Sequence, residues 1–167
     1  FNGALGQAFT DHCGEFQGTL KQVLEMPLEN NFQRAVFVAG LNAVLRFLGR
    51  IDKTVHCRDE EPRQCAEELV TYFKTVHGNV RIAQFALRVL DLDTENIGVR
   101  RFNVLVESPE ATAEVLQWAD TLLVTGTTLV NGTLEQFLGG KPVVFYGTTI
   151  AGAAHLMGWS RFCVRGR

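Results

Sequence analysis

The feature that most constrains the fold is an alternation of short apolar runs with helical stretches in the second half of the chain. The runs of strand length cover 80–86, 87–92, 102–106, 121–125, 142–146 and 161–164. Stretches with the apolar spacing of a helix lie between several of them, at 111–118, 134–138 and 151–157. Strands that alternate with helices form parallel sheets, so this half predicts an α/β fold: a Rossmann-like, mostly parallel sheet with helices on both faces.

The first part of the chain has a different pattern. Residues 3–9 are extended and Gly-rich, which predicts a short strand, and residues 16–24 have helical apolar spacing. Apolar residues from 31 to about 49 cover two faces of a longer helix, which we expect to be buried on most sides. A polar segment then separates this part from the rest. We predict a small α+β portion over residues 1–55 and a Rossmann-like domain over residues 56–167.

One run breaks the alternation. Between residues 80 and 92 two strand-like pieces follow one another without a helix, although a parallel crossover needs a dozen or more residues. Either the two pieces form one long bent strand, or residues between them are absent from the given sequence. We favour the second interpretation.

Charge and hydropathy limit the classes of partner. The 167 residues carry a formal net charge of −2, and the sixteen basic residues are scattered, so we expect no binding to nucleic acid. The longest nearly apolar stretch, 35–45, is interrupted by Asn42 and is shorter than the ~20 residues that cross a bilayer. Four cysteines in a chain with enough core predict reduced thiols. We therefore expect a cytoplasmic protein without membrane contact, as a monomer or a homo-oligomer.

The strongest functional feature is a repeated Gly-Thr-Thr elbow. The first elbow, 125–128, follows one predicted strand, and the second elbow, 146–149, follows the next. Ligands of open parallel sheets bind in the crevice outside the carboxyl ends of the strands, where glycine admits a ligand close to the backbone and threonine hydroxyls bind it. We predict an anion site, such as a phosphate or carboxylate cradle, formed by Thr125, Gly126, Thr127, Thr128, Asn131, Tyr146, Gly147, Thr148 and Thr149.

The same residues have a purely structural interpretation. Threonine and asparagine cap helices, and glycine makes turns, so each elbow alone could be no more than a strand-to-helix connection. The duplication favours a shared site over that alternative. Valine at Gly126 or Gly147 is expected to abolish ligand binding while leaving a folded protein.

A second candidate site lies in the polar segment around His56, Cys57 and Cys65. Imidazole and thiolate, with three carboxylates between them, are ligands of transition metals, so a transition metal is a candidate cofactor of these three residues. The spacing fits no standard zinc finger. Catalysis is an alternative, with Cys57 as nucleophile and His56 as proton carrier. The structural alternative is that the acidic residues begin a helix and that Cys65 is core.

Asp91 is a weaker candidate. It ends a strand-like run, where a carboxylate can bind a ribose in Rossmann folds, but no glycine-rich fingerprint precedes it. A turn or a helix cap is therefore the favoured role of this acidic stretch. The isolated His12, His77 and His155 are expected at the surface or in packing, although His155 follows the second elbow closely.

Residues 120–133, followed by 144–152, resemble the heavy-metal chelation family, a family of unassigned function. The segments around His56, Cys57 and Cys65 and around Asp91 are also similar to that family. The resemblance implies a shortened domain like the N-terminal domain of enolase over residues 1–55, followed by a Rossmann-like domain with partial likeness to methyltransferases.

The resemblance also implies a function. It suggests metal chelation, or the binding or processing of a metal-chelating small molecule such as a pterin, a flavin or a siderophore-like compound, at a cleft between the two domains. An enzyme acting on a chelator precursor, a non-catalytic metal or metallophore carrier and an interaction module without ligand all remain open. We expect the elbow residues to line the site, with His56 and Cys57 reaching into it.

Overall fold

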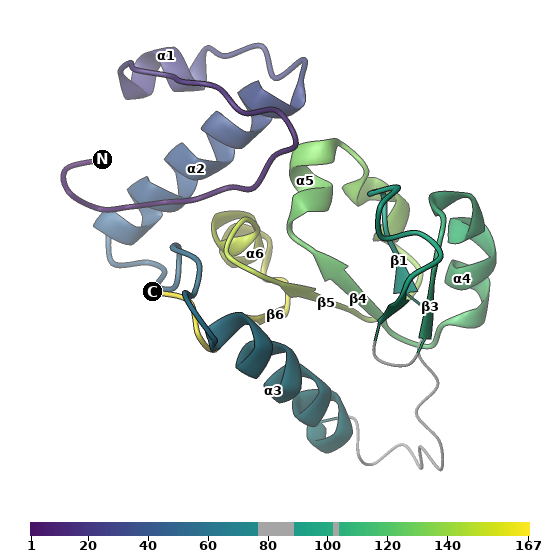
Figure 1. The fold of residues 1–167 in the computed structure, drawn as a ribbon. Coiled ribbons are helices and arrows are strands. Elements are labelled where there is room, and N and C mark those ends of the chain that lie inside the picture. Colours follow the sequence, from purple (N-terminus) through teal and green to yellow (C-terminus); the bar gives the residue numbers. More distant parts are fainter. Residues whose placement is uncertain (77–88, 102–103) are drawn as a thin grey trace. The chain divides into compact units, whose positions relative to one another are not determined.

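The computed structural model describes residues 1–76, 89–101 and 104–167 of the chain (Figure 1). The chain folds as two compact units. The first consists of residues 1–71 and 121–167, and the second of residues 72–120. These two units do not test the division predicted at residue 55, with an enolase-like portion before it, so that division stays a prediction.

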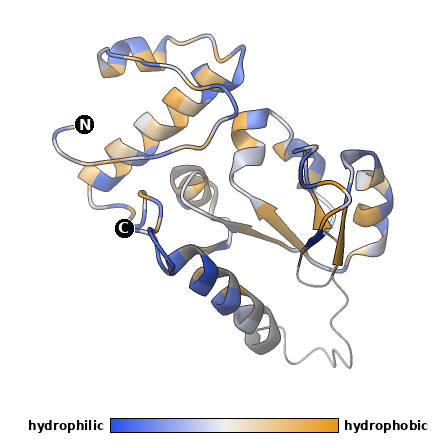
Figure 2. Ribbon diagram, viewed as in Figure 1, coloured by the Kyte–Doolittle hydropathy of each residue, from blue (hydrophilic) through white to orange (hydrophobic). Residues whose placement is uncertain are grey.

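A three-stranded parallel sheet is the centre of the first unit. Its strands are β4 (Leu122–Thr125), β5 (Val143–Tyr146) and β6 (Arg161–Phe162), in that order. The connections contain α5 (Thr127–Asn131), the 3-10 helix η2 (Leu134–Phe137) and α6 (Ala151–Met157). Val124 and Phe145 are buried in this sheet, and β4 is correspondingly orange in Figure 2. Parallel strands with helices between them confirm the predicted α/β class.

Helix α2 (Asn31–Phe47) packs against both α5 and α6. It begins where the Asn30 side chain accepts a hydrogen bond from the backbone N–H of Gln33, which is a standard helix cap. Ala35 and Val38 of this helix form a buried hydrophobic cluster with Val130 of α5. The predicted long helix is thus formed, and its contacts explain why it is apolar on more than one side.

The segment before α2 is less regular than predicted. Helix α1 covers only Leu20–Leu24, because Thr19 and Gln22 form a capping box that begins the helix there. Residues 3–9 form no strand; their backbone bonds go to loops and side chains instead. Gln7 donates its N–H to the carbonyl of Thr54, and Phe9 donates to Oγ1 of Thr149. The bond from Phe9 holds the N-terminal segment against the second elbow.

The second unit contains β1 (Val89–Leu90), β2 (Arg100–Arg101), β3 (Val104–Glu107), the 3-10 helix η1 (Pro109–Ala111) and α4 (Thr112–Trp118). Strand β1 pairs parallel with β3, whereas β2 pairs antiparallel with it. Helix α3 (Glu61–Val76) begins in the first unit with hydrophilic residues, drawn blue in Figure 2. The predicted strand at 80–86 and most of the 80–92 run lie outside the described residues.

Within the described ranges, each helix is too short or too polar to span a bilayer.

Candidate functional site

The two Gly-Thr-Thr elbows line one pocket. Strands β4 and β5 pair in parallel with Thr125 opposite Tyr146, and the N–H of Gly126 donates to the carbonyl of Tyr146 at 3.1 Å. Because β4 and β5 run in parallel and end at paired residues, both elbows lie at the same end of the sheet. The pocket has a volume of about 220 Å³. Its lining, which we call the elbow pocket, consists of Phe9, His56, Thr125, Gly126, Thr127, Tyr146, Gly147, Thr148 and Thr149.

The first elbow satisfies its own hydroxyls. Thr128 Oγ1 donates to the Thr125 carbonyl at 2.8 Å, and Thr127 Oγ1 lies 3.2 Å from Thr125 Oγ1. Gly126 has an ordinary φ of −63°, but a Cβ there would lie 2.6 Å from the backbone nitrogen of Ile150. Glycine is therefore required by the close approach of the two elbows. Valine would displace Ile150, so Gly126→Val cannot separate binding from folding as the sequence suggested.

The second elbow contains a buried hydroxyl without a hydrogen-bond partner among the described residues. Thr148 is only 2% exposed, and within the described part of the chain its Oγ1 has no hydrogen-bond partner. Gly147 has a φ of +90°, which favours glycine, and no atom lies within 4 Å of a Cβ placed there. A buried hydroxyl without a partner costs about 1–3 kcal/mol. A ligand that bonds Thr148 would recover this energy.

Asn42 fixes the backbone of the second elbow. This residue of α2 is completely buried, and its Nδ2 donates to the carbonyls of Thr148 and Thr149 at 3.2 and 3.1 Å and to that of Gln7 at 3.0 Å. Its Oδ1 accepts from the N–H of Gly152 at 2.7 Å. One side chain thus joins α2, the N-terminal segment and both sides of the turn that carries Thr148.

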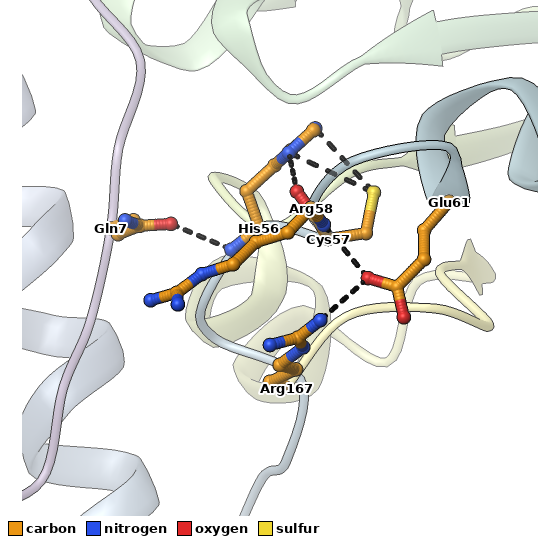
Figure 3. A network of polar contacts seen from close by, with 6 residues as sticks. All are labelled: Gln7, His56, Cys57, Arg58, Glu61 and Arg167. Atoms are coloured by element: carbon orange, nitrogen blue, oxygen red, sulfur yellow. Dashed lines mark hydrogen bonds and ion pairs between the residues drawn. The ribbon is translucent and has the colours of Figure 1, made fainter.

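His56 forms a further wall of the pocket, and Figure 3 shows its surroundings. Its backbone N–H donates to Oε1 of Gln7 at 2.6 Å, and its Nδ1 lies 2.7 Å from the carbonyl oxygen of Cys57. The ring packs edge-on against Phe9, with centroids 5.1 Å apart and an angle of 76° between the planes. A carbonyl oxygen can only accept, so Nδ1 donates the hydrogen of this bond.

The Cys57 thiol lies beside the imidazole, with Sγ 3.7 Å from Nδ1 and 3.9 Å from Nε2 of His56 (Figure 3). Burial, followed by the charges of Cys65 and Cys163, raises the pKa of the Cys57 thiol. A catalytic cysteine needs the opposite shift, because the thiolate is the nucleophile. The geometry brings the predicted catalytic pair together, but the electrostatics do not activate it.

The residues present are a poor match for a bare metal ion. Across the ranges that the structure describes, no three His, Cys, Asp or Glu side chains are arranged as ligands of one ion. Cys57, Cys65 and Cys163 are all free and half-buried. The metal site predicted for His56, Cys57 and Cys65 therefore stays a prediction.

Three predicted ligand-binding residues lie elsewhere. Thr128 is buried and caps the turn of the first elbow, and Asn131 ends α5, where its Oδ1 lies 3.5 Å from Nδ2 of Asn31. Asp91 belongs to the second unit. Its carboxylate accepts hydrogen bonds from the N–H of Asp93 and from Nδ2 of Asn96, both at 3.0 Å. This is the local turn that we favoured for the acidic stretch.

Two residues of the site were missed from the sequence. Phe9 reaches the pocket through a hydrogen bond to Thr149, 140 residues away in the chain. Asn42 was noticed only as an interruption of an apolar stretch. A single amide inside an otherwise apolar helix is itself a signal, because a buried polar group needs partners.

The chain is an α/β protein with a pocket at the carboxyl ends of two parallel strands. The model of the DUF364 family, described as "Putative heavy-metal chelation", matches residues 59–154, which is more than half of the chain. The chain belongs to this family, as the resemblance in 120–133 and 144–152 implied.

The fold is similar to that of one solved structure. It is a protein of unknown function from Pyrococcus horikoshii that belongs to the same family. The two share 19% sequence identity with a TM-score of 0.51, over 86% of this chain and 59% of that one. This likeness shows the fold alone, and the chain spans 59% of the length of that protein. The curated proteins include no match to the chain.

Proposed function

We propose that this protein binds an anionic, metal-chelating small molecule in the elbow pocket. The family to which the chain belongs is described as "Putative heavy-metal chelation", a description that names no particular ligand. Phe9 comes from the predicted portion 1–55, and all other lining residues come from 56–167. The pocket thus draws on both predicted parts of the chain, although it belongs to one compact unit.

The observation that carries the proposal is the hydroxyl of Thr148. Thr148 is one of the residues that line the pocket, and its Oγ1 is buried with no hydrogen-bond partner among the described residues. By contrast, Thr128, the second threonine of the first elbow, donates its hydroxyl to the Thr125 carbonyl within that elbow. An oxygen of a carboxylate, phenolate or phosphate would accept a hydrogen bond from Thr148 and remove the cost of the open donor.

Charge around the pocket favours an anion. None of its lining residues is acidic. Arg161 donates from Nε to the carbonyl of Gly147 at 2.9 Å and from Nη2 to that of Lys53 at 2.6 Å. This guanidinium brings a positive charge to the backbone of the second elbow, where it attracts a negative ligand.

Nucleophilic catalysis is the second candidate, with Cys57 as nucleophile and His56 as proton carrier. The distance of 3.7 Å between Sγ and Nδ1 supports it. The raised pKa of the thiol opposes it, since at neutral pH the thiol remains protonated. Binding is therefore the function that we place first, without a covalent step.

The test begins with protein purified without an affinity tag. Native mass spectrometry should detect a bound compound of small mass, and elemental analysis should detect the metal that it carries. Thr148→Val should reduce the bound fraction about tenfold, which corresponds to one lost hydrogen bond to a charged group. Thr128→Val is the matched control and should retain the compound.

Two outcomes would contradict the proposal. Equal retention by both valine variants would remove Thr148 from the site. A protein that carries no compound, and whose melting temperature no metal, chelator or metabolite raises, would support an interaction module instead.

A further inference from the structure

The large side chains that line the elbow pocket are all rings. Phe9, His56 and Tyr146 contribute these rings, and the other described lining residues are four threonines and two glycines. Phe9 is 47% exposed and Tyr146 is 36% exposed, so neither residue belongs to the closed core. Exposed aromatic surface is unfavourable in water, and a ligand that covers these two rings would recover that free energy.

Contacts within the protein restrict the positions of the rings. The backbone N–H of Phe9 donates to Oγ1 of Thr149, and the Phe9 ring packs edge-on against His56 with the centroids 5.1 Å apart. Tyr146 is the last residue of β5 and pairs with Thr125 of β4. Side chains held in this way lose little conformational freedom when a flat ligand packs against them, which favours binding.

Other classes of small molecule match this lining less well. A sugar needs amide, carboxylate or guanidinium partners for its hydroxyl groups, and none of the described lining residues carries such a side chain. An alkyl chain packs best against aliphatic side chains, but the described lining includes no leucine, isoleucine, valine or methionine. A flat ring prefers offset-stacked or edge-to-face aromatic neighbours, and these are the large side chains that the pocket offers.

The volume of the pocket limits the ligand to a small compound. It is about 220 Å³, which is below the roughly 300–1,000 Å³ of pockets for drug-sized compounds. A protein cavity of about 150 Å³ can bind benzene. The elbow pocket thus has room for an aromatic ring with an anionic substituent.

We propose that the ligand of the elbow pocket carries a flat aromatic ring, which packs against Phe9 and Tyr146. This inference rests on the proposed function and narrows it from an anion of any shape to a small aromatic anion, such as an aromatic carboxylate. Phe9 and Tyr146 recognise the ring, whereas the positive charge that Arg161 brings to the second elbow favours the anionic group.

The test compares benzoate with cyclohexanecarboxylate, which has the same charge and ring size but no aromatic face. NMR titration of each compound with the full chain gives the two dissociation constants. Apolar area alone would favour cyclohexanecarboxylate, which has the larger apolar surface. We expect the opposite order, with benzoate bound about three- to tenfold more tightly, because aromatic pairs gain free energy beyond that of their buried area.

The decisive variant is Phe9→Leu, which keeps an apolar side chain and the backbone bond to Thr149 but removes the ring. It should weaken the binding of benzoate until the two dissociation constants lie within about twofold of each other. Its affinity for cyclohexanecarboxylate should stay within about twofold of the wild-type value, which also shows that the variant is folded.

Phe47→Leu is the matched control. Phe47 is 49% exposed, and its ring packs edge-on against Phe1 with the centroids 5.2 Å apart, much as Phe9 packs against His56. It is not among the residues that line the pocket. This variant should therefore keep the wild-type preference for benzoate.

Benzylamine separates this inference from the proposed function, because it presents the same ring with a positive charge. If the wild type prefers benzoate to cyclohexanecarboxylate but binds benzylamine as tightly as benzoate, the proposed anion site is wrong and the aromatic preference stands. Equal binding of the two carboxylates, or an unchanged preference in Phe9→Leu, overturns the inference and leaves the proposed function standing. If neither carboxylate binds to the wild type, both proposals fall.

Discussion

The two elbows have the same Gly-Thr-Thr sequence but different structures. In the first elbow, Gly126 has an ordinary helical φ and is wedged against Ile150, and Thr128 bonds inside its own turn. In the second, Gly147 has a positive φ in open space, and Thr148 is buried with no partner among the described residues. The first elbow is a packing element, and the second carries the open donor.

The difference comes from what surrounds each copy. The Asn42 side chain of α2 bonds the carbonyls of Thr148 and Thr149, whereas the first elbow has no such support among the described residues. With its carbonyls fixed from outside, the second elbow does not need its hydroxyl for the turn. A repeated motif therefore predicts a shared location, whereas the role of each copy depends on distant partners.

The largest expected effect follows from breaking the support of the second elbow. Asn42→Ala removes the contacts of Nδ2 with three carbonyls and the bond of Oδ1 with the N–H of Gly152. The Thr148 carbonyl keeps the N–H of Ala151, but the N–H of Gly152 loses its acceptor, so we expect a loss of about 3–4 kcal/mol of unfolding free energy. Urea denaturation measures this loss. Asn131→Ala, at the end of the first elbow's helix, is the control and should cost no more than about 0.5 kcal/mol. Equal costs would remove the distinction between the elbows.

The second effect compares the two glycines. Gly126→Ala places a methyl group 2.6 Å from the nitrogen of Ile150, and this backbone clash should cost about 2–3 kcal/mol. Gly147→Ala meets no atom within 4 Å and should cost only about 1 kcal/mol, from its positive φ. Chemical unfolding of both variants gives the order. The reverse order would mean that the second elbow, not the first, is the packed one.

The sequence predicted the regular elements of this site well. Helix α6 has the predicted bounds, 151–157, because its apolar spacing is continuous and Gly158 ends it with a left-handed φ of 67°. Strands β4 and β5 also lie within the predicted runs. Each of these elements is determined by residues that are close to one another in the chain.

The parts that the sequence did not predict depend on distant partners. The backbone of residues 5–9 bonds to Thr54 and Thr149 rather than to a strand, and Asn42 reaches Thr148 across 106 residues. Periodicity carries no information on such bonds. The roles of Phe9, Asn42 and the open Thr148 could therefore be found only from the structure.

A third, smaller effect is that valine at Thr128 and valine at Thr148 should change the free energy of unfolding in opposite directions. Thr128→Val removes the hydrogen bond to the Thr125 carbonyl and should cost about 1 kcal/mol. Thr148→Val removes a buried hydroxyl that lacks a described partner, so stability should be unchanged or rise by up to about 1 kcal/mol. The same substitution at these two buried threonines thus has opposite effects in urea denaturation. A loss at Thr148 as large as that at Thr128 would show that its hydroxyl is bonded after all.

The smallest expected effect concerns the segment that contains His56, a lining residue of the elbow pocket. The Glu61 carboxylate accepts from the N–H of Arg58 at 2.7 Å and from Arg167 at 2.9 Å (Figure 3). These bonds lower the pKa of Glu61, with the Arg58 N–H as the larger cause. A carboxyl group whose pKa is lowered by folding stabilises the protein above its ordinary pKa, and the contribution is lost as the pH falls through the lowered value.

Glu61→Gln should therefore lower the melting temperature slightly at neutral pH, and the difference from the wild type should vanish on acidification below the ordinary range of glutamate. The effect is small because the side chain is exposed to solvent and salt. Glu60→Gln removes the same charge at the adjacent position and is the control. If the two variants follow the same curve of melting temperature against pH, net charge is the cause, and the bonds of Glu61 do not hold the His56 segment. If only Glu61→Gln converges with the wild type in acid, the position of His56 depends on an ion pair at the base of α3, whereas the second elbow depends on an uncharged amide.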